Sequence, residues 1–136
     1  MNAECQCGQL SVVCSDTVPA PGPVVCHCVA CQRRTGSPFG VVAYYSADQI
    51  VATGEAKRFA RSTDEGNRFE AYFCPNCGST VYVKSGKHPT KIGIPIGAIA
   101  DPSFPTPVRS VWEQTMHAWV TMPGDVQHYP RGRGKP

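Results

Sequence analysis

The stretch Cys74-Pro75-Asn76-Cys77-Gly78 decides the fold, because two cysteines two residues apart and followed by glycine are typical of a zinc-binding turn. In such a turn the backbone doubles back and directs both thiolates at one ion. Glycine takes the positive φ that the turn needs, and Pro75 fixes φ in its other half. The segment Cys5-Gln6-Cys7-Gly8 has the same character near the N-terminus. We call segments 5–8 and 74–78 the first and second knuckles.

A third group, Cys26-His27-Cys28-Val29-Ala30-Cys31, lies between the two knuckles. Seven of the eight cysteines therefore fall into three tight groups. Disulfide scaffolds scatter their cysteines to join distant loops, whereas metal sites cluster them. One Cys-x-x-Cys alone could be a redox pair, but three groups together favour zinc. Cys14 has no near neighbour in a strand-like apolar run, so we predict a buried apolar thiol.

The seven clustered cysteines divide naturally into four and three. Zinc takes four ligands in a structural site and three plus an open position in a catalytic one. The two knuckles predict a closed structural site of Cys5, Cys7, Cys74 and Cys77. The central group predicts an open catalytic site of Cys26, Cys28 and Cys31. Two zinc ions per chain are expected, the second of them labile.

A histidine could instead complete the central site, and that alternative stays open. His27 lies between two ligand cysteines, so we expect its ring to point away from their ion. The ring would then donate to a backbone carbonyl or pack against the site. For His88, His117 and His128, which have no ligand partner at short spacing, we predict surface or packing roles.

The rest of the pattern predicts a mainly β fold. The chain has 136 residues with 13 glycines and 13 prolines, which favours short elements and many turns. Runs rich in β-branched and aromatic residues predict strands at 10–14, 24–25, 40–45, 57–61, 68–73, 80–83 and 92–97. One helical turn is expected after Cys28, ended by Gly36. Trp112, Met116 and Trp119 have rough helical spacing and are expected in the core or a pocket wall.

The length and the charge predict one domain over residues 1–128 and a flexible basic tail over 129–136, which includes Arg131, Arg133 and Lys135. The net charge of +3 and the lack of a basic face argue against nucleic acid as a partner. The N-terminal residues lack the features of a secretory signal, and no apolar run approaches the ~20 residues of a membrane helix. A cytoplasmic protein with no membrane partner is therefore expected.

The combined motif of residues 5–8, 26–39 and 73–79 resembles the glutathione-dependent formaldehyde-activating enzyme family, which includes the centromere protein V domain. The resemblance covers residues 3–125. It implies an Mss4-like arrangement of small antiparallel sheets with zinc-ribbon-like knuckles. It also implies a structural zinc on the four knuckle cysteines and a catalytic zinc on the central three. The implied activity is that of a carbon–sulfur lyase, joining glutathione and formaldehyde as S-(hydroxymethyl)glutathione.

The chemistry suits an open zinc position, where a bound thiol would lose its proton. Three thiolates already leave such a site with a net charge of about −1, which weakens Lewis acidity and favours delivery of a thiolate. Arg33 or Arg34 could offset that charge or clamp a substrate carboxylate. The named enzyme is longer, with extra segments that help hold glutathione. The expected substrate is therefore a small thiol or carbonyl compound, with glutathione as one candidate.

Two other functions remain open from the sequence. One is a non-enzymatic zinc module that binds protein or nucleic acid, as the centromere protein branch suggests. The other is a redox or metal sensor built on the exposed three-cysteine group, whose thiolates would be open to oxidation.

Overall fold

The computed structural model describes residues 1–134, and its internal contacts divide the chain into two units. Unit 1 consists of Met1–Pro21 and Ala43–Phe104. Unit 2 consists of Gly22–Val42 and the chain from Pro105 onward. The described strands form two sheets, so the fold is mainly β as predicted.

Unit 1 contains a small antiparallel sheet in the order β1-β2-β5. Its strands are β1 (Asn2–Glu4), β2 (Ser11–Val13) and β5 (Val51–Thr53). Ala3 pairs with Val12, and both side chains are buried. The first knuckle is the connection from β1 to β2, so the pairing of these strands fixes both of its ends.

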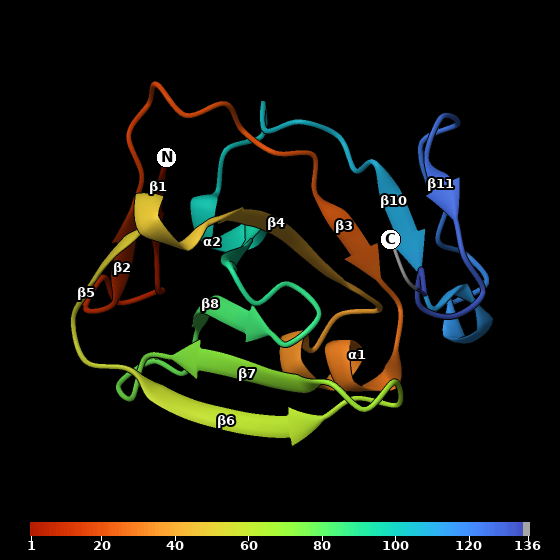
Figure 1. The fold of residues 1–136 in the computed structure, drawn as a ribbon, viewed down its shortest axis with the longest axis horizontal. Coiled ribbons are helices and arrows are strands. Elements are labelled where there is room, and N and C mark those ends of the chain that lie inside the picture. Colours follow the sequence, from red (N-terminus) through yellow and green to blue (C-terminus); the bar gives the residue numbers. More distant parts are fainter. Residues whose placement is uncertain (135–136) are drawn as a thin grey trace. The chain divides into compact units, whose positions relative to one another are not determined.

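Unit 1 also contains four strands in the order β9-β8-β7-β6, with antiparallel pairing throughout. They are β6 (Lys57–Ser62), β7 (Arg68–Phe73), β8 (Thr80–Ser85) and β9 (Lys91–Pro95). Figure 1 shows β6, β7 and β8 side by side. The second knuckle joins β7 to β8, with a register shift at Tyr72/Phe73 beside it. The strands predicted at 68–73 and 80–83 are thus present and form a hairpin around the knuckle.

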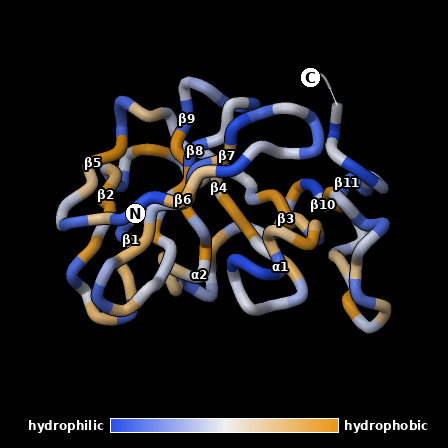
Figure 2. The backbone as a smooth tube through the Cα atoms, turned by 90° about the horizontal axis from the view of Figure 1, so that it is seen from below, coloured by the Kyte–Doolittle hydropathy of each residue, from blue (hydrophilic) through white to orange (hydrophobic). Residues whose placement is uncertain are grey.

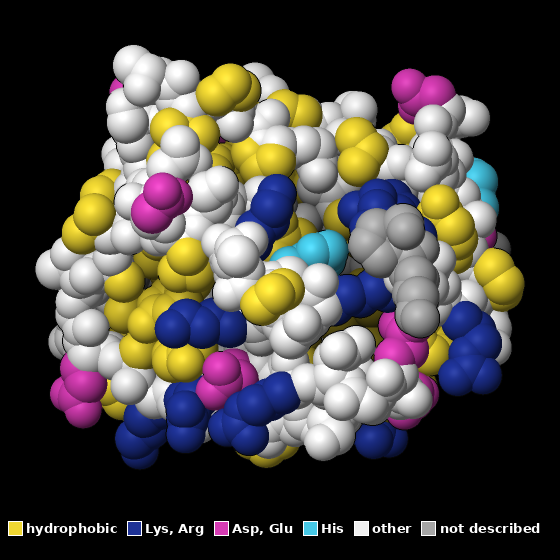
Figure 3. All heavy atoms as spheres, viewed as in Figure 1, with side chains coloured by type: hydrophobic (Ala, Val, Ile, Leu, Met, Phe, Trp, Pro, Cys, Tyr) yellow, Lys and Arg dark blue, Asp and Glu magenta, His cyan; other side chains and the backbone are white. Residues whose placement is uncertain are grey.

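The outer strand pair of this sheet has mixed charges. Along the lower edge of Figure 3, where Figure 1 shows β6, several Lys and Arg side chains lie with a few acidic ones among them. Glu70 lies 3.1 Å from Arg58 and 3.5 Å from Arg68. Opposite charges interspersed in this way make no continuous basic surface on β6 and β7.

The core of unit 1 includes one cysteine from each knuckle. Leu10, Val12, Val81 and Ile94 are fully buried there, together with Cys5 and Cys74. Cys14 is also buried in this cluster, which confirms its prediction as an apolar thiol. Unit 1 is completed by two short helical segments, η1 (Ala47–Gln49) and α2 (Ile96–Ile99). Two of the predicted metal ligands thus belong to the hydrophobic core itself.

Unit 2 contains β3 (Val24–Cys26), β10 (Arg109–Val111) and β11 (Gln127–His128), in the order β11-β10-β3. β3 pairs antiparallel with the start of β4 (Gly40–Ser46), which continues into unit 1. Both strands have predominantly hydrophobic sequences (Figure 2).

One prediction about the sheets was wrong. β10 pairs in parallel with both β3 and β11, so the sheets are not purely antiparallel. The parallel partner of β3 enters only at Arg109, after the chain has passed through unit 1. A parallel pair requires such a long crossover, and local strand patterns do not reveal it.

The helical predictions had mixed outcomes. Helix α1 (Val29–Thr35) follows Cys28 and ends at Gly36, as expected. Around Trp112 the structure has only the 3₁₀ turn η2 (Glu113–Thr115), so the rough helical spacing does not correspond to a helix. Trp119 is 72% exposed, so its predicted place in the core was wrong, and a place in a pocket wall stays a prediction. No helix in residues 1–134 has the length and apolar character needed to cross a membrane.

The start of the predicted tail makes contacts within unit 2. The carbonyl of Arg131 accepts a hydrogen bond from the Trp112 N–H at 3.0 Å, and its guanidinium lies 5.1 Å from the centre of the Trp112 ring. The carbonyls of Tyr129 and Pro130 accept from the next two N–H groups. Lys135, the last basic residue of the tail, lies outside the described residues.

Candidate metal centres

The structure gathers the seven clustered cysteines into two sets of sulfur atoms, each with all members within 4.8 Å of one another. One set consists of Cys5, Cys7, Cys74 and Cys77. The other consists of Cys26, Cys28 and Cys31. Each set lies within one unit, the first in unit 1 and the second in unit 2. Among the described residues, neither set includes a histidine or carboxylate.

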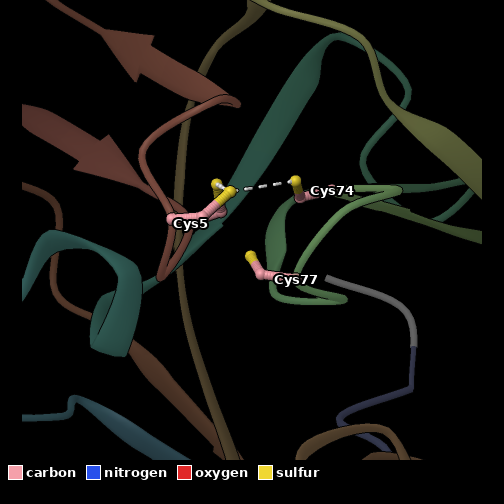
Figure 4. A group of neighbouring side chains, drawn as sticks. Cys5, Cys74 and Cys77 are labelled. Carbon is pink, nitrogen blue, oxygen red and sulfur yellow. Dashed lines mark hydrogen bonds between the residues drawn. The ribbon is translucent and has the colours of Figure 1, made fainter.

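The four-cysteine group is built by the two knuckles facing each other. Figure 4 shows the sulfur atoms of Cys5, Cys74 and Cys77 turned toward a common point from two separate turns. The Cys7 sulfur lies 3.6 Å from that of Cys5 and 3.6 Å from that of Cys74. Two sulfurs bound tetrahedrally to one zinc at about 2.3 Å lie about 3.8 Å apart. The four residues therefore fit a closed zinc site.

Both knuckles have the backbone that their sequences predict. Gly8 has φ of +83° and Gly78 has φ of +80°, the region that only glycine adopts easily. The Gly8 N–H donates to the Cys5 carbonyl and the Gly78 N–H to the Cys74 carbonyl, which closes each turn. Further N–H groups point at sulfur: Leu10 donates to Cys5 Sγ at 3.2 Å. Such donors stabilise thiolates.

Ser79 connects the two knuckles. Its hydroxyl oxygen accepts a hydrogen bond from the Gln6 N–H at 3.2 Å and lies 3.4 Å from the Cys77 sulfur. Hydrogen bonding by Ser79 lowers the pKa of the Cys77 thiol to about 5. Cys77 therefore favours the thiolate form at neutral pH, which is the form that binds a metal.

The three-cysteine group occupies the connection from β3 to α1. Cys26 ends β3, Cys28 is the N-cap of α1, and Cys31 lies in the first helical turn. The Cys31 N–H donates to the Cys28 sulfur at 3.4 Å. Cys26 and Cys28 are half-buried and Cys31 is buried. Hydrogen bonds to Cys28 and Cys31, together with burial, raise the pKa of the Cys26 thiol. Three thiolates this close need a cation, which fits a metal site.

His27 is buried beside this group and lies between two of its cysteines. Its Nε2 is 2.8 Å from the Ser110 hydroxyl. Its ring packs edge-on against the ring of Phe39, with the two ring centres 5.8 Å apart. The packing agrees with the expectation, whereas the hydrogen-bond partner is a side chain rather than a carbonyl. Burial lowers the pKa of His27, so its ring favours the neutral form.

The backbone around His27 is held by residues that sequence patterns did not identify. Its carbonyl accepts from Gln32 Nε2 at 2.9 Å and from the Thr115 hydroxyl at 2.7 Å. The amide oxygen Oε1 of Gln32 lies 2.9 Å from the ring nitrogen Nε2 of His117. Ser110 and Thr115 are more than 80 residues from their partners in sequence, so no local motif could have shown these contacts.

The remaining histidines lie outside both cysteine sets, in agreement with their predicted surface or packing roles. His88 packs against Tyr44, with ring centres 4.5 Å apart. His128 Nδ1 lies 2.7 Å from the carboxylate of Glu113. Hence no histidine of residues 1–134 belongs to either cysteine set.

The two candidate substrate-binding arginines differ in exposure. Both lie in the last turn of α1, but Arg33 is exposed and Arg34 is partly buried. The Nε and Nη2 atoms of Arg34 are buried and have no hydrogen-bond partner within residues 1–134. The sequence did not distinguish these neighbours, because which of them faces the protein depends on the packing of β4 against α1.

Comparisons with known proteins agree with this architecture. Residues 1–120 match the family model of the glutathione-dependent formaldehyde-activating enzyme. A crystal structure of a Rhodobacter sphaeroides protein from a structural genomics programme is similar, with a TM-score of 0.57 and 18% identity. That match covers 72% of this chain and 86% of the other, and at this identity it shows a shared fold. No curated protein matches the sequence.

Proposed function

This chain belongs to the glutathione-dependent formaldehyde-activating enzyme family, and from that premise we propose that it is a zinc-dependent carbon–sulfur lyase with an Mss4-like fold. In the proposed reaction a thiol adds to a small aldehyde such as formaldehyde. The new bond joins sulfur to the carbonyl carbon, and the thiol proton ends on the carbonyl oxygen. The reverse reaction cleaves the same bond.

The observation that carries this proposal is the difference between the two cysteine groups. Cys5, Cys7, Cys74 and Cys77 supply four sulfurs, which fill a tetrahedral site. Cys26, Cys28 and Cys31 supply three, and the described chain adds no fourth ligand. A four-ligand ion in the second group would keep one position for an outside molecule. This supports a structural role for the first group and a catalytic role for the second.

Zinc bound by the three cysteines would supply a positive charge that lowers the pKa of an incoming thiol. The chain's own residues set the conditions for that chemistry. Their thiolates leave the site with a charge of about −1, which favours a nucleophilic sulfur over activation of the carbonyl. The half-buried Cys26 and Cys28 leave this group open to solvent on one side, whereas Cys31 is buried.

Arg33 is the arginine placed to contact substrate in this proposal. It is exposed in the last turn of α1, the helix that contains Cys31. A guanidinium there can bind a carboxylate in bidentate fashion, and glutathione has two carboxylates. The proposed substrate class is a small thiol with an anionic group, with glutathione as one member, in a reducing compartment such as the cytoplasm.

The test is a direct assay of the zinc-loaded protein with formaldehyde and a panel of thiols, glutathione among them, following formation of the S-hydroxymethyl product by NMR. We expect Cys28→Ser to abolish the rate enhancement. Cys14→Ala is the matched control, because Cys14 belongs to neither metal group, and it should keep the activity. Equal rates for wild-type protein and Cys28→Ser with every thiol would contradict the proposal.

A further inference from the structure

Arg34 has an unusual environment for a charged residue. Its Nε and Nη2 atoms are buried, and neither has a hydrogen-bond partner in the described part of the chain. These two atoms form the edge of the guanidinium that binds an anion with two parallel hydrogen bonds. A buried cation whose best binding edge is unpaired is costly unless an anion lies close to it.

The cysteine group is the nearby source of negative charge. Arg34 and Cys31 are three residues apart in α1, so their side chains lie on the same helix face. Both side chains also lie against the same residue of β4, Gly40. The guanidinium therefore lies close to the Cys31 side chain.

Gly40 makes room for this arrangement at the start of β4. A Cβ on Gly40 would lie 2.6 Å from Arg34 Nη2, far inside normal contact distance, and 3.5 Å from the Cβ of Cys31. The same glycine thus contacts both the cation and a cysteine of the group. A larger residue at position 40 would displace the guanidinium of Arg34, whereas its contact with Cys31 would have an ordinary van der Waals distance.

From this geometry we infer that Arg34 is a positioning residue, a fixed positive charge seated on Gly40 that stabilises the metal-bound thiolates of Cys26, Cys28 and Cys31. This inference deepens the proposed function and rests on it. A substrate clamp must be reachable by substrate, and the buried Nε–Nη2 edge is not. The two adjacent arginines then have different roles: Arg33 faces solvent and substrate, and Arg34 faces the protein's own anions.

The charge balance explains why such a residue is useful. Three thiolates on a divalent ion give a charge of about −1, and a fourth thiolate from substrate would make this about −2. One fixed guanidinium adds one positive charge, so the net charge becomes about 0 before the substrate thiolate binds and about −1 after it binds. Because the charge is needed before substrate arrives, it acts on metal binding itself, and removing it weakens the site without any reaction taking place.

The experiment measures zinc affinity of the three-cysteine site by competition with a chromophoric chelator, using folded protein whose four-cysteine site is already filled. Removing residues that support metal ligands typically weakens binding about 10–100-fold. We expect Arg34→Met to fall in that range and Arg34→Lys, which keeps the charge, to recover part of the loss. Arg33→Met is the matched control and should stay within about twofold of wild type. In cobalt-substituted protein, the thiolate-to-metal absorption band should shift in Arg34→Met and stay unchanged in Arg33→Met.

Gly40→Ala provides an independent test, since it displaces the end of a flexible side chain and leaves the cysteines in place. It should weaken zinc binding as Arg34→Met does, and the double variant should be no weaker than either single one. Equal zinc affinity in Arg34→Met and Arg33→Met would overturn the inference while leaving the proposed function intact. If the wild-type protein binds only one zinc ion, the inference about Arg34 and the proposed function are both wrong.

Discussion

The Nε2 atom of His27 lies 2.8 Å from the Oγ atom of Ser110, and both residues are completely buried. This contact joins the connection between Cys26 and Cys28 to β10, in which Ser110 lies 83 residues further along the chain. The parallel pairing of β3 with β10 brings the two residues together, with Cys26 directly opposite Val111. The position of the three-cysteine group thus depends on the strand pair that sequence patterns failed to show.

Replacing Ser110 with alanine should destabilise the protein by about 1–3 kcal/mol, because the buried imidazole nitrogen loses its partner. The free energy of unfolding from urea titration measures this. Ser62→Ala, at the exposed end of β6, is a suitable control and should change stability by less than about 0.5 kcal/mol. If the two variants unfolded at the same urea concentration, the contact would have no energetic importance.

The two cysteine groups should respond differently to mutation. Cys5 is part of the unit 1 core, and an ion held by its group should contribute on the order of 10 kcal/mol to folding. Cys5→Ser should therefore unfold the protein or lower its melting temperature sharply, whereas Cys28→Ser should retain most of the fold. Thermal melts followed by circular dichroism compare them. Identical melting temperatures would contradict the division into a structural and a catalytic site.

Metal content provides a further test. We expect two zinc ions per chain in reduced protein, measured by elemental analysis. A mild chelator should remove the ion of the three-cysteine group first, since three protein ligands hold it instead of four. The second ion should leave only as the protein unfolds. Release of both ions in a single step at one chelator concentration would show that the sites are equivalent.

Glu113 should make the stability depend on pH in the acid range. Burial alone would raise the pKa of its carboxyl, but hydrogen bonds to Ser110 and His128 lower it below the ordinary value of 4.5. A lowered carboxyl pKa stabilises the fold above the unfolded value, and this contribution disappears as pH falls through the folded value. Glu113→Gln should therefore be less stable than wild type near pH 7.

The difference in the free energy of unfolding between Glu113→Gln and wild type should become smaller as pH falls below about 4.5. Urea unfolding from pH 7 to pH 3 measures it, and the comparison cancels metal loss in acid, which affects both proteins. For Glu55→Gln, at an exposed position, the difference in the free energy of unfolding from wild type should stay constant from pH 7 to pH 3. A constant gap for Glu113→Gln would mean that the carboxylate has no role in acid sensitivity.

Local patterns predicted the elements on which the cysteines lie. The hairpin around Cys74 and Cys77 and the helix after Cys28 follow from turn residues and strand propensity within a few positions. The division of the cysteines into four and three followed from zinc chemistry, which limits each ion to four ligands. These inferences need only neighbouring residues and the preferences of one ion.

The missed features depend on contacts across long stretches of chain. The parallel pairing of β10 with β3 and the Ser110 and Thr115 contacts to His27 join residues over 80 positions apart. Trp119 is not in the core, one of its two predicted places, because hydrophobic spacing does not show whether a segment has anything to pack against. The different environments of Arg33 and Arg34 likewise follow from Gly40 on a separate strand.

The four-cysteine group joins two turns whose cysteines are 67 residues apart, Cys7 and Cys74. An ion held there would act as a cross-link between distant parts of the chain, as a disulfide does, and would restrict the unfolded chain by closing a long loop. Unlike a disulfide, it forms without an oxidant and opens without a reductant. The abundance of folded protein in a cell would then follow the supply of metal rather than the redox state of the compartment.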